Sequence, residues 1–114
     1  MTPCAIYLRT SVEESRGEYA LVSDLEMCRS HAAAQGYIII GEFNDMRPDG
    51  SMDRPGLNTL RHAMSEHGGG IMIIPRDEAL APDASDRQGV ADALESENIL
   101  IEVARPLAAQ TTVA

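Results

Sequence analysis

Four short apolar runs alternate along this chain with longer segments of helical periodicity, and this alternation limits the possible folds more than any other feature. The runs are nearly continuous and bounded by Gly, Pro or polar residues, which is typical of strands buried on both faces of a parallel sheet. They span Cys4–Arg9, Tyr37–Phe43, Gly70–Pro75 and Asn98–Val103. Strand–helix–strand repetition implies right-handed βαβ units. The sequence therefore predicts an α/β fold, a small three-layer sandwich with a mostly parallel sheet of four to five strands.

Three segments carry apolar stripes with the spacing of a helix face. The first, 18–36, closes with Gly36, which is well placed just past a helix end. The second, 54–68, starts with Pro55 and closes with Gly68. The third, 83–98, is weakened by Gly89. The residues expected to face inward are Leu21, Leu25, Cys28 and Ala32 in the first segment, Leu57, Leu60 and Met64 in the second, and Val90, Ala93 and Leu94 in the third.

The length of 114 residues predicts one domain, large enough to bury a core without disulfides. We assign residues 1–104 to this domain and 105–114 to a C-terminal tail without a clear pattern. No apolar run approaches the roughly 20 residues that span a bilayer. No signal-peptide pattern opens the chain, so we expect a cytoplasmic protein without a membrane partner. Cys4 and Cys28 are then expected to be free thiols in the core, and no spacing or motif points to a metal or a cofactor.

The net charge of -9 argues against a large nucleic-acid interface. Between Asp77 and Glu102 there are eight acidic residues and one base, Arg87. Such a surface repels a phosphate backbone unless a local basic site overrides it. The three histidines, at positions 31, 62 and 67, lie on or near predicted helices without ligand spacing, and we expect them to be surface or half-buried side chains.

Polar residues gather in the three segments that leave the predicted carboxyl ends of the strands, which is where open α/β sheets bind ligands. A serine hydroxyl that attacks a phosphodiester needs cations around the phosphate, and the planar fork of arginine suits this task. Ser11 could instead cap a helix through its "SVEE" stretch, and the arginines could form inert ion pairs with Asp45 and Asp53. The residues concerned are Arg9, Ser11, Asp45, Asp53, Arg54, Arg76 and Asp77.

The order of the pieces resembles the catalytic domain of the serine site-specific recombinases, the resolvase/invertase family. The resemblance runs from about Ala5 to Val103. It rests on a Tyr-x-Arg-x-Ser opening at Tyr7 and an Asp-Arg-x-Gly-Leu sequence at Asp53. The stretches that carry it are "AIYLRTS", "CRSHAAAQGY", "GEFNDMRPDGSMDRPGLNTL" and "IMIIPRDEAL".

The resemblance implies roles for six residues. Ser11 matches the nucleophile that attacks DNA and forms a phosphoserine linkage, and Arg9 matches the arginine beside it. Asp45 and Arg54 match an acidic residue and a phosphate-binding arginine of that site. Tyr7 matches a supporting aromatic at the strand end, and Asp77 the aspartate that follows the third strand.

The pattern breaks after the third strand, where the family has Asp-Arg-x-x-Arg. Here Glu78 and Ala81 occupy the two arginine positions. A glutamate there adds like-charge repulsion, and each lost phosphate contact raises the barrier by roughly 3–4 kcal/mol. Arg76 could replace one arginine only along a different loop path. The glutamine of the family's first helix is also missing, with Asp24 near its position.

Two hypotheses follow. The first is a degenerate serine-recombinase-like domain that has lost efficient strand cleavage and acts through protein–protein contacts, chiefly self-association as a dimer. The second is a working catalytic domain that binds DNA with regions located elsewhere, since the family's long helix after the fourth strand and its DNA-binding domain are not among these 114 residues. A third, weaker hypothesis is a leftover anion site for a small phosphorylated ligand.

Overall fold

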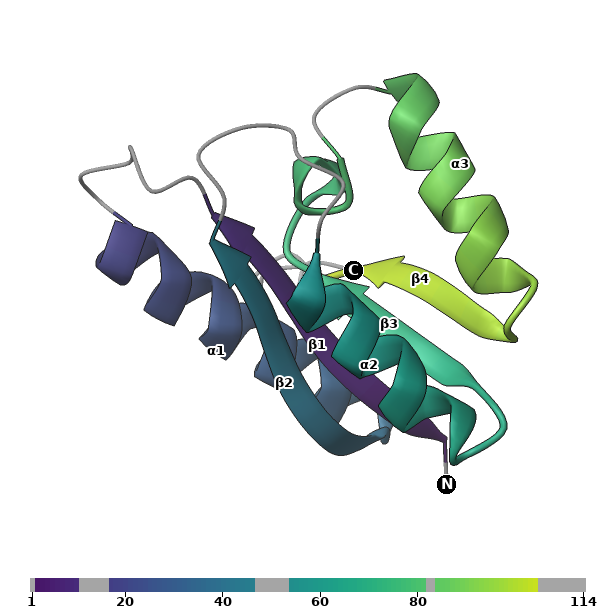
Figure 1. Ribbon diagram of the computed structural model, residues 1–114. Helices are drawn as coiled ribbons and strands as arrows, with labels where there is room; N and C mark the ends of the chain where they lie inside the picture. Colours follow the sequence, from purple (N-terminus) through teal and green to yellow (C-terminus); the bar gives the residue numbers. More distant parts are fainter. Residues whose placement is uncertain (1, 11–16, 47–53, 82–83, 105–114) are drawn as a thin grey trace, which may run out of the picture.

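The computed structural model describes residues 2–10, 17–46, 54–81 and 84–104. Strands and helices alternate through these residues, as Figure 1 shows. In chain order the elements are β1 (Pro3–Thr10), α1 (Gly17–Gln35), β2 (Ile38–Met46), α2 (Pro55–Ser65), β3 (Gly70–Ile74), the 3-10 turn η1 (Asp77–Ala79), α3 (Ala84–Glu95) and β4 (Ile99–Val103).

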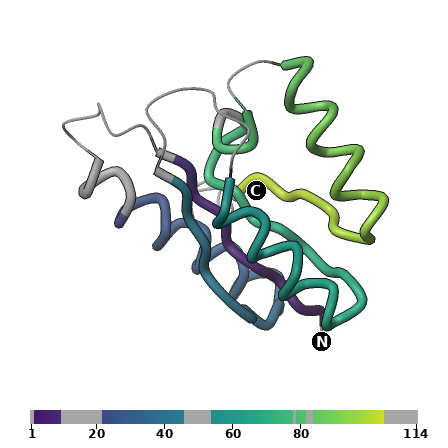
Figure 2. The backbone as a smooth tube through the Cα atoms, in the orientation of Figure 1, coloured from purple at the N-terminus to yellow at the C-terminus, as the bar shows by residue number. Residues whose placement is uncertain are grey.

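The four strands form one parallel sheet in the order β2-β1-β3-β4. Helix α1 lies on one face of this sheet, and α2 and α3 lie on the other (Figures 1 and 2). The predicted three-layer α/β sandwich is therefore confirmed, with four strands within the described part of the chain. No helix in that part is both long enough and apolar enough to span a membrane.

Strand β1 explains why the sequence runs are continuously apolar. Its side chains point alternately to the two faces of the sheet. Ala5 and Tyr7 pack with α2 and α3, whereas Cys4, Ile6 and Leu8 pack against α1. Because both faces are covered, all five side chains are buried and no polar alternation appears.

The predicted helix stripes are largely correct. Cys28 and Ala32 of α1 are buried, Leu25 is partly buried, and the side chain of Leu21 lies outside the described residues. In α2, all three stripe residues, Leu57, Leu60 and Met64, are buried. In α3, Val90 and Leu94 are buried, but the prediction for Ala93 was wrong: it is exposed, because it borders a groove between α2 and α3.

The glycines at the start of β3 allow this strand to enter the centre of the sheet. A Cβ on Gly69, at φ 107, would lie 2.3 Å from the Asn98 carbonyl oxygen. A Cβ on Gly70, at φ 155, would lie 2.4 Å from the Pro3 carbonyl oxygen. Any other residue would push β3 away from both neighbouring chain segments.

On the α1 side of the sheet, a cluster of polar side chains connects α1 to β4. His31 Nε2 lies 2.8 Å from one carboxylate oxygen of Glu102, and the Tyr37 hydroxyl donates to the other at 2.5 Å. His31 is only 5% exposed, so the expectation of a surface or half-buried histidine was wrong for this residue. Burial raises the pKa of Glu102, but the hydrogen bonds from Tyr37 and His31 outweigh it and leave that pKa lowered.

The two cysteines are buried free thiols, as predicted. Burial, reinforced by Glu102, raises the pKa of Cys4 to about 11. Burial, reinforced by Asp24, raises the pKa of Cys28 to about 12. Both thiols therefore stay protonated at neutral pH and behave as small apolar side chains.

We predict that Glu102→Gln destabilises the fold by about 1.5–3 kcal/mol at pH 7, the range for hydrogen bonds to a charged group. Since the pKa of Glu102 is lowered in the fold, its contribution is present above the ordinary value of 4.5 and is lost as the pH falls through the lowered pKa. The difference between variant and wild type should thus shrink on acidification. Urea unfolding at pH 7 and pH 3.5 measures it. The matched control is Glu42→Gln, which removes an exposed pair with Arg29 and should cost under about 1 kcal/mol; equal losses in the two variants would contradict this role.

Candidate functional site

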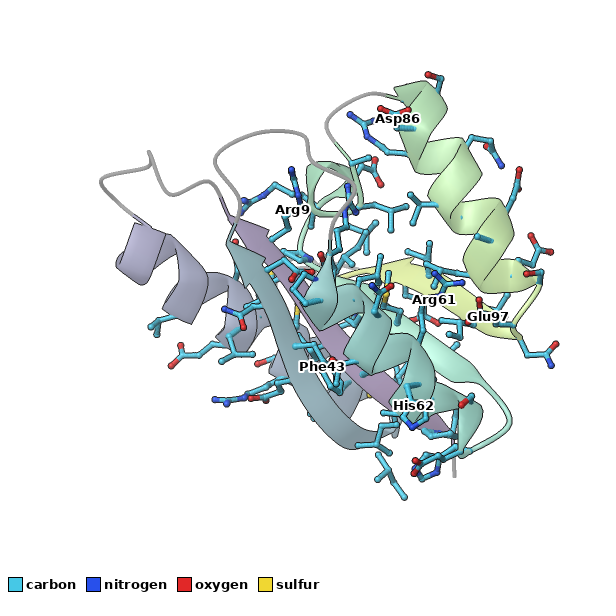
Figure 3. All side chains as sticks on the ribbon, viewed as in Figure 1. Arg9, Phe43, Arg61, His62, Asp86 and Glu97 are labelled. Carbon is cyan, nitrogen blue, oxygen red and sulfur yellow. The ribbon has the colours of Figure 1, made fainter. Side chains whose placement is uncertain are left out.

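The carboxyl ends of β1, β2 and β3 meet at one edge of the sheet and bring most of the predicted site residues together. Arg9 and Asp45 are register partners at the ends of β1 and β2. Arg54 precedes α2, and Asp77 opens η1 after β3. Ser11, the predicted nucleophile, lies outside the described residues, as does Asp53. Figure 3 shows Arg9 at this edge of the sheet.

Asp45 is buried and joins three elements. One of its carboxylate oxygens accepts hydrogen bonds from the Tyr7 hydroxyl at 2.7 Å and from the Leu57 backbone N–H at 3.0 Å. The other accepts from the Gly56 N–H at 2.7 Å. Gly56 and Leu57 are in the first turn of α2, whose N–H groups have no partners inside the helix. Asp45 therefore caps α2 from the neighbouring strand, with a charge that suits the positive end of the helix.

The contacts of Asp45 depend on the residues around it. A Cβ on Gly56 would lie 2.3 Å from the Asn44 carbonyl oxygen, so the glycine lets α2 approach β2. Burial, followed by the hydrogen bond to Asp45, raises the pKa of Tyr7 well above its ordinary value. Tyr7 therefore stays protonated and acts as a hydrogen-bond donor that fixes the Asp45 carboxylate.

Arg54 is the most deeply buried cation of this edge, with 2% of its surface exposed. Its Nη1 donates to the Leu80 carbonyl oxygen and so connects the start of α2 to the segment after β3. Its Nε and Nη2 are buried without a hydrogen-bond partner. No ion pair joins Arg54 to a described residue, and Asp53, one of its two suggested partners, lies outside the described residues. A guanidinium in this state is poorly compensated and suits an added anion.

Arg76, the candidate replacement arginine, is paired with an acid of α1. Its Nη2 forms hydrogen bonds to both carboxylate oxygens of Asp24 on α1, at 2.8 and 2.9 Å. The Asp24 side chain is nearly buried, whereas half of the Arg76 side chain is exposed. Arg76 is thus the partner of Asp24, the residue near the position of the family's missing glutamine.

The segment after β3 has no arginine at the two positions where the family has one. Asp77 is exposed at the start of η1. Ala81, at the second arginine position, is buried with 1% exposure, and its carbonyl oxygen accepts a hydrogen bond from Arg87. The side chain of Glu78 lies outside the described residues. Among the residues that the structure describes, no group of three or more His, Cys, Asp or Glu side chains could hold a metal ion.

Residues 4–112 match the family described as Resolvase, N terminal domain. The chain belongs to this family. Among curated proteins, no sequence is significantly similar to it.

Solved structures with the same fold include several serine recombinases. A resolvase family site-specific recombinase from Streptococcus pneumoniae superposes with a TM-score of 0.76 at 16% identity, over 91% of this chain and 72% of that one. The C-terminal catalytic domain of ISC1926 TnpA, an IS607-like serine recombinase, gives 0.74 at 20% identity, over 89% and 68%. The N-terminal catalytic domain of TP901-1 integrase gives 0.71 at 18% identity, over 89% and 75%. Likeness at these identities shows the shared fold.

The resolvase-type fold brings Tyr7, Arg9, Asp45 and Arg54 to one edge of the sheet, and their catalytic roles remain predictions. Two features were not anticipated from the sequence. The cap that Asp45 forms on α2 could have been suspected, because a buried acid ends the second strand shortly before a helix that has arginine as its N-cap. The pairing of Asp24 with Arg76, 52 residues apart, had no local signal.

We predict that Asp45→Ala destabilises the domain by at least about 2 kcal/mol, because it leaves two helix N–H groups and the Tyr7 hydroxyl without an acceptor. Tyr7→Phe removes only one of the three contacts and should cost about 1 kcal/mol. Urea denaturation followed by far-ultraviolet circular dichroism measures both. If Asp45→Ala is no more harmful than Tyr7→Phe, Asp45 does not cap α2.

Proposed function

We propose that this resolvase-type domain has lost, or retains only weakly, the ability to cleave DNA, and that it acts through protein–protein contacts, chiefly self-association. The observation that carries the proposal is the pair between Arg76 and Asp24. This pair engages Arg76, the cation next to Asp77, in the part of the chain where the family has two arginines.

The electrostatics of phosphate attack support this reading. Negative charge on the phosphate grows in the transition state, and preorganised cations lower the barrier. Loss of one such donor typically raises the barrier by about 3–4 kcal/mol, or a factor of several hundred in rate. Here Ala81 and Glu78 stand in place of two donors, and Glu78 brings a negative charge. Of the arginines that match the family's pattern, Arg9 and Arg54 remain to bind and activate the phosphate.

Exposed apolar side chains support a role in protein contacts. Five large ones lie on the surface of the described residues, on α1 and on the two edge strands. They are Val22, Ile38, Ile39, Leu100 and Val103. Scattered apolar residues are normal on a protein surface, but edge strands that carry them are suited to pairing with another chain. The net charge of -9 opposes DNA binding.

A second candidate is a working recombinase domain with Ser11 as nucleophile. One observation favours it: Arg9 and Asp45 stay in register at the strand ends, and Arg54 keeps two guanidinium nitrogens without partners. A phosphate bound at the strand ends would need cations placed in this way. In this case DNA would be the partner, and its binding regions would lie outside these residues.

The first prediction concerns cleavage. Incubation with supercoiled DNA that carries candidate sites should give no covalent protein–DNA complex on a denaturing gel, for the wild type as for Ser11→Ala. A complex formed by the wild type and absent in Ser11→Ala would contradict the loss of cleavage. Arg76→Ala then locates the missing cation, because a complex that also disappears in this variant would make Arg76 the substitute arginine.

The second prediction concerns assembly. Light scattering coupled to size-exclusion chromatography should give a mass above the 12.3 kDa of one chain at high protein concentration. The mass should fall on dilution and should increase with added salt, because like-charged copies repel each other less when screened. A strict monomer at every concentration would remove self-association from the proposal.

A further inference from the structure

A groove of about 280 Å³ lies between α2 and α3, on the face of the sheet opposite α1. In Figure 1 the two helices stand apart on this face. Its volume is near the lower end of small-molecule sites, which measure roughly 300–1,000 Å³. Most of its walls are apolar, with Leu57 contributed by α2 and Val90 and Leu94 by α3.

Arg54 stands in the wall of this groove. Its Nη1 is taken by the Leu80 carbonyl oxygen, whereas Nε and Nη2 are buried without a partner. Nε and Nη2 form one edge of the planar guanidinium, which is the edge that binds a carboxylate through two parallel hydrogen bonds. A buried cation with this edge unfilled and an adjacent apolar groove calls for an acid group on an apolar body.

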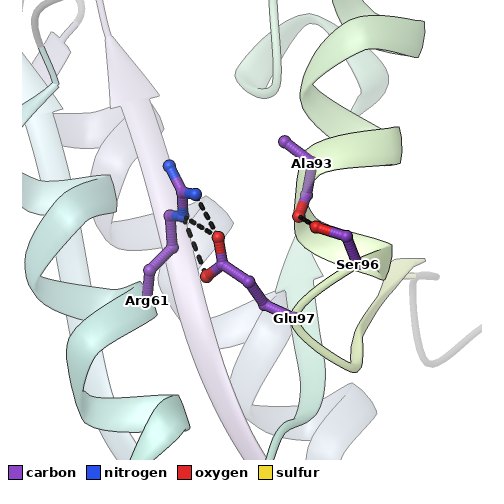
Figure 4. Close-up of polar contacts among 4 residues, drawn as sticks. All are labelled: Arg61, Ala93, Ser96 and Glu97. Atoms are coloured by element: carbon purple, nitrogen blue, oxygen red, sulfur yellow. Dashed lines mark hydrogen bonds and ion pairs between the residues drawn. The ribbon is translucent and has the colours of Figure 1, made fainter.

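The other charged residues of the groove do not fill this need. Arg61 binds Glu97 through several hydrogen bonds and is thereby neutralised, as Figure 4 shows. Asp86, labelled in Figure 3 on α3, brings a negative charge to the rim. Arg54 is therefore the only cation of the groove without a carboxylate partner among the described residues.

We propose that the α2–α3 groove binds a small molecule with one carboxylate and an apolar body, such as a short-chain fatty acid. The carboxylate would accept from Nε and Nη2 of Arg54, and the apolar body would lie against Leu57, Val90 and Leu94. Since both nitrogens are covered, the wall has to open slightly for the ligand, so binding should affect both helices. The low dielectric around Arg54 would strengthen the ion pair once it forms.

The test is a titration of the full-length, nitrogen-15-labelled chain with hexanoate at pH 7 and constant ionic strength, followed by amide NMR. We expect saturable shifts that are largest in α2 and α3. Acetate has the same head group without the apolar body, and hexanamide has the same body without the charge. Each should bind at least about tenfold more weakly, as expected for the loss of apolar burial or of a charged hydrogen bond.

Variants at two positions test the location. Arg54→Met should weaken hexanoate binding by about tenfold or more, and Asp86→Asn should tighten it by removing like charge. Gly89 lines the groove, and a Cβ there meets no atom within 4 Å, so the position accepts a side chain. Gly89→Met should obstruct the groove, and Gly89→Ala should leave binding nearly unchanged.

Three results would overturn the proposal. They are the absence of saturable shifts with hexanoate, equal binding of hexanamide, and unchanged binding in Gly89→Met. If Arg54→Met does not fold, the pair of Gly89 variants still decides the location. All of these outcomes are independent of DNA cleavage and of self-association.

Discussion

The carboxylate of Asp45 is the contact on which the strand-end site depends. It is held by the Tyr7 hydroxyl of β1 and by two backbone N–H groups of α2, so it fixes two strands and a helix at one point. A buried carboxylate is tolerated only where hydrogen bonds of this kind replace its water. This arrangement fixes the edge of the sheet beside the segment in which the chain departs from its family's pattern. It also sets the start of α2 and, with it, the position of Arg54.

Arg76 and Arg54 have different environments, and this difference underlies the proposed function. Arg76 is satisfied by Asp24, a partner from the opposite layer of the sandwich. Arg54 is buried, and its guanidinium donates a hydrogen bond to the Leu80 carbonyl oxygen. The domain thus joins the segment after β3 to both α1 and α2 through arginine side chains. Both contacts hold that segment against its neighbours, and the guanidinium of Arg76 is engaged by Asp24.

The sequence predicted the layers of the fold because the signals were local. Continuous apolar runs such as Cys4–Arg9 indicate a sheet that is covered on both sides. The spacing of Leu57, Leu60 and Met64 indicates one buried face of a helix. Ala93 was misplaced because its exposure depends on the spacing between α2 and α3, which periodicity does not encode. His31 was misplaced because its partners, Glu102 and Tyr37, come from other elements.

The site was predictable only as a set of residues at the strand ends. That Tyr7, Arg9, Asp45 and Arg54 would share one edge followed from parallel strands. The individual hydrogen-bond partners could not be predicted from the sequence, because the two residues of each pair lie far apart in it. Asp24 and Arg76 are 52 residues apart, and Arg54 and Leu80 are 26 apart. Both depend on the path of the chain after β3.

The most direct test of the central claim is a crystal structure of the whole chain grown with sulfate, a stand-in for the attacked phosphate. The claim is that Arg76 belongs to Asp24 and leaves the strand-end site short of positive charge. It predicts that Arg76 stays within hydrogen-bonding distance of Asp24 and that no sulfate bridges Arg76 and the Ser11 hydroxyl. A sulfate held between those two side chains, with Asp24 released, would contradict it.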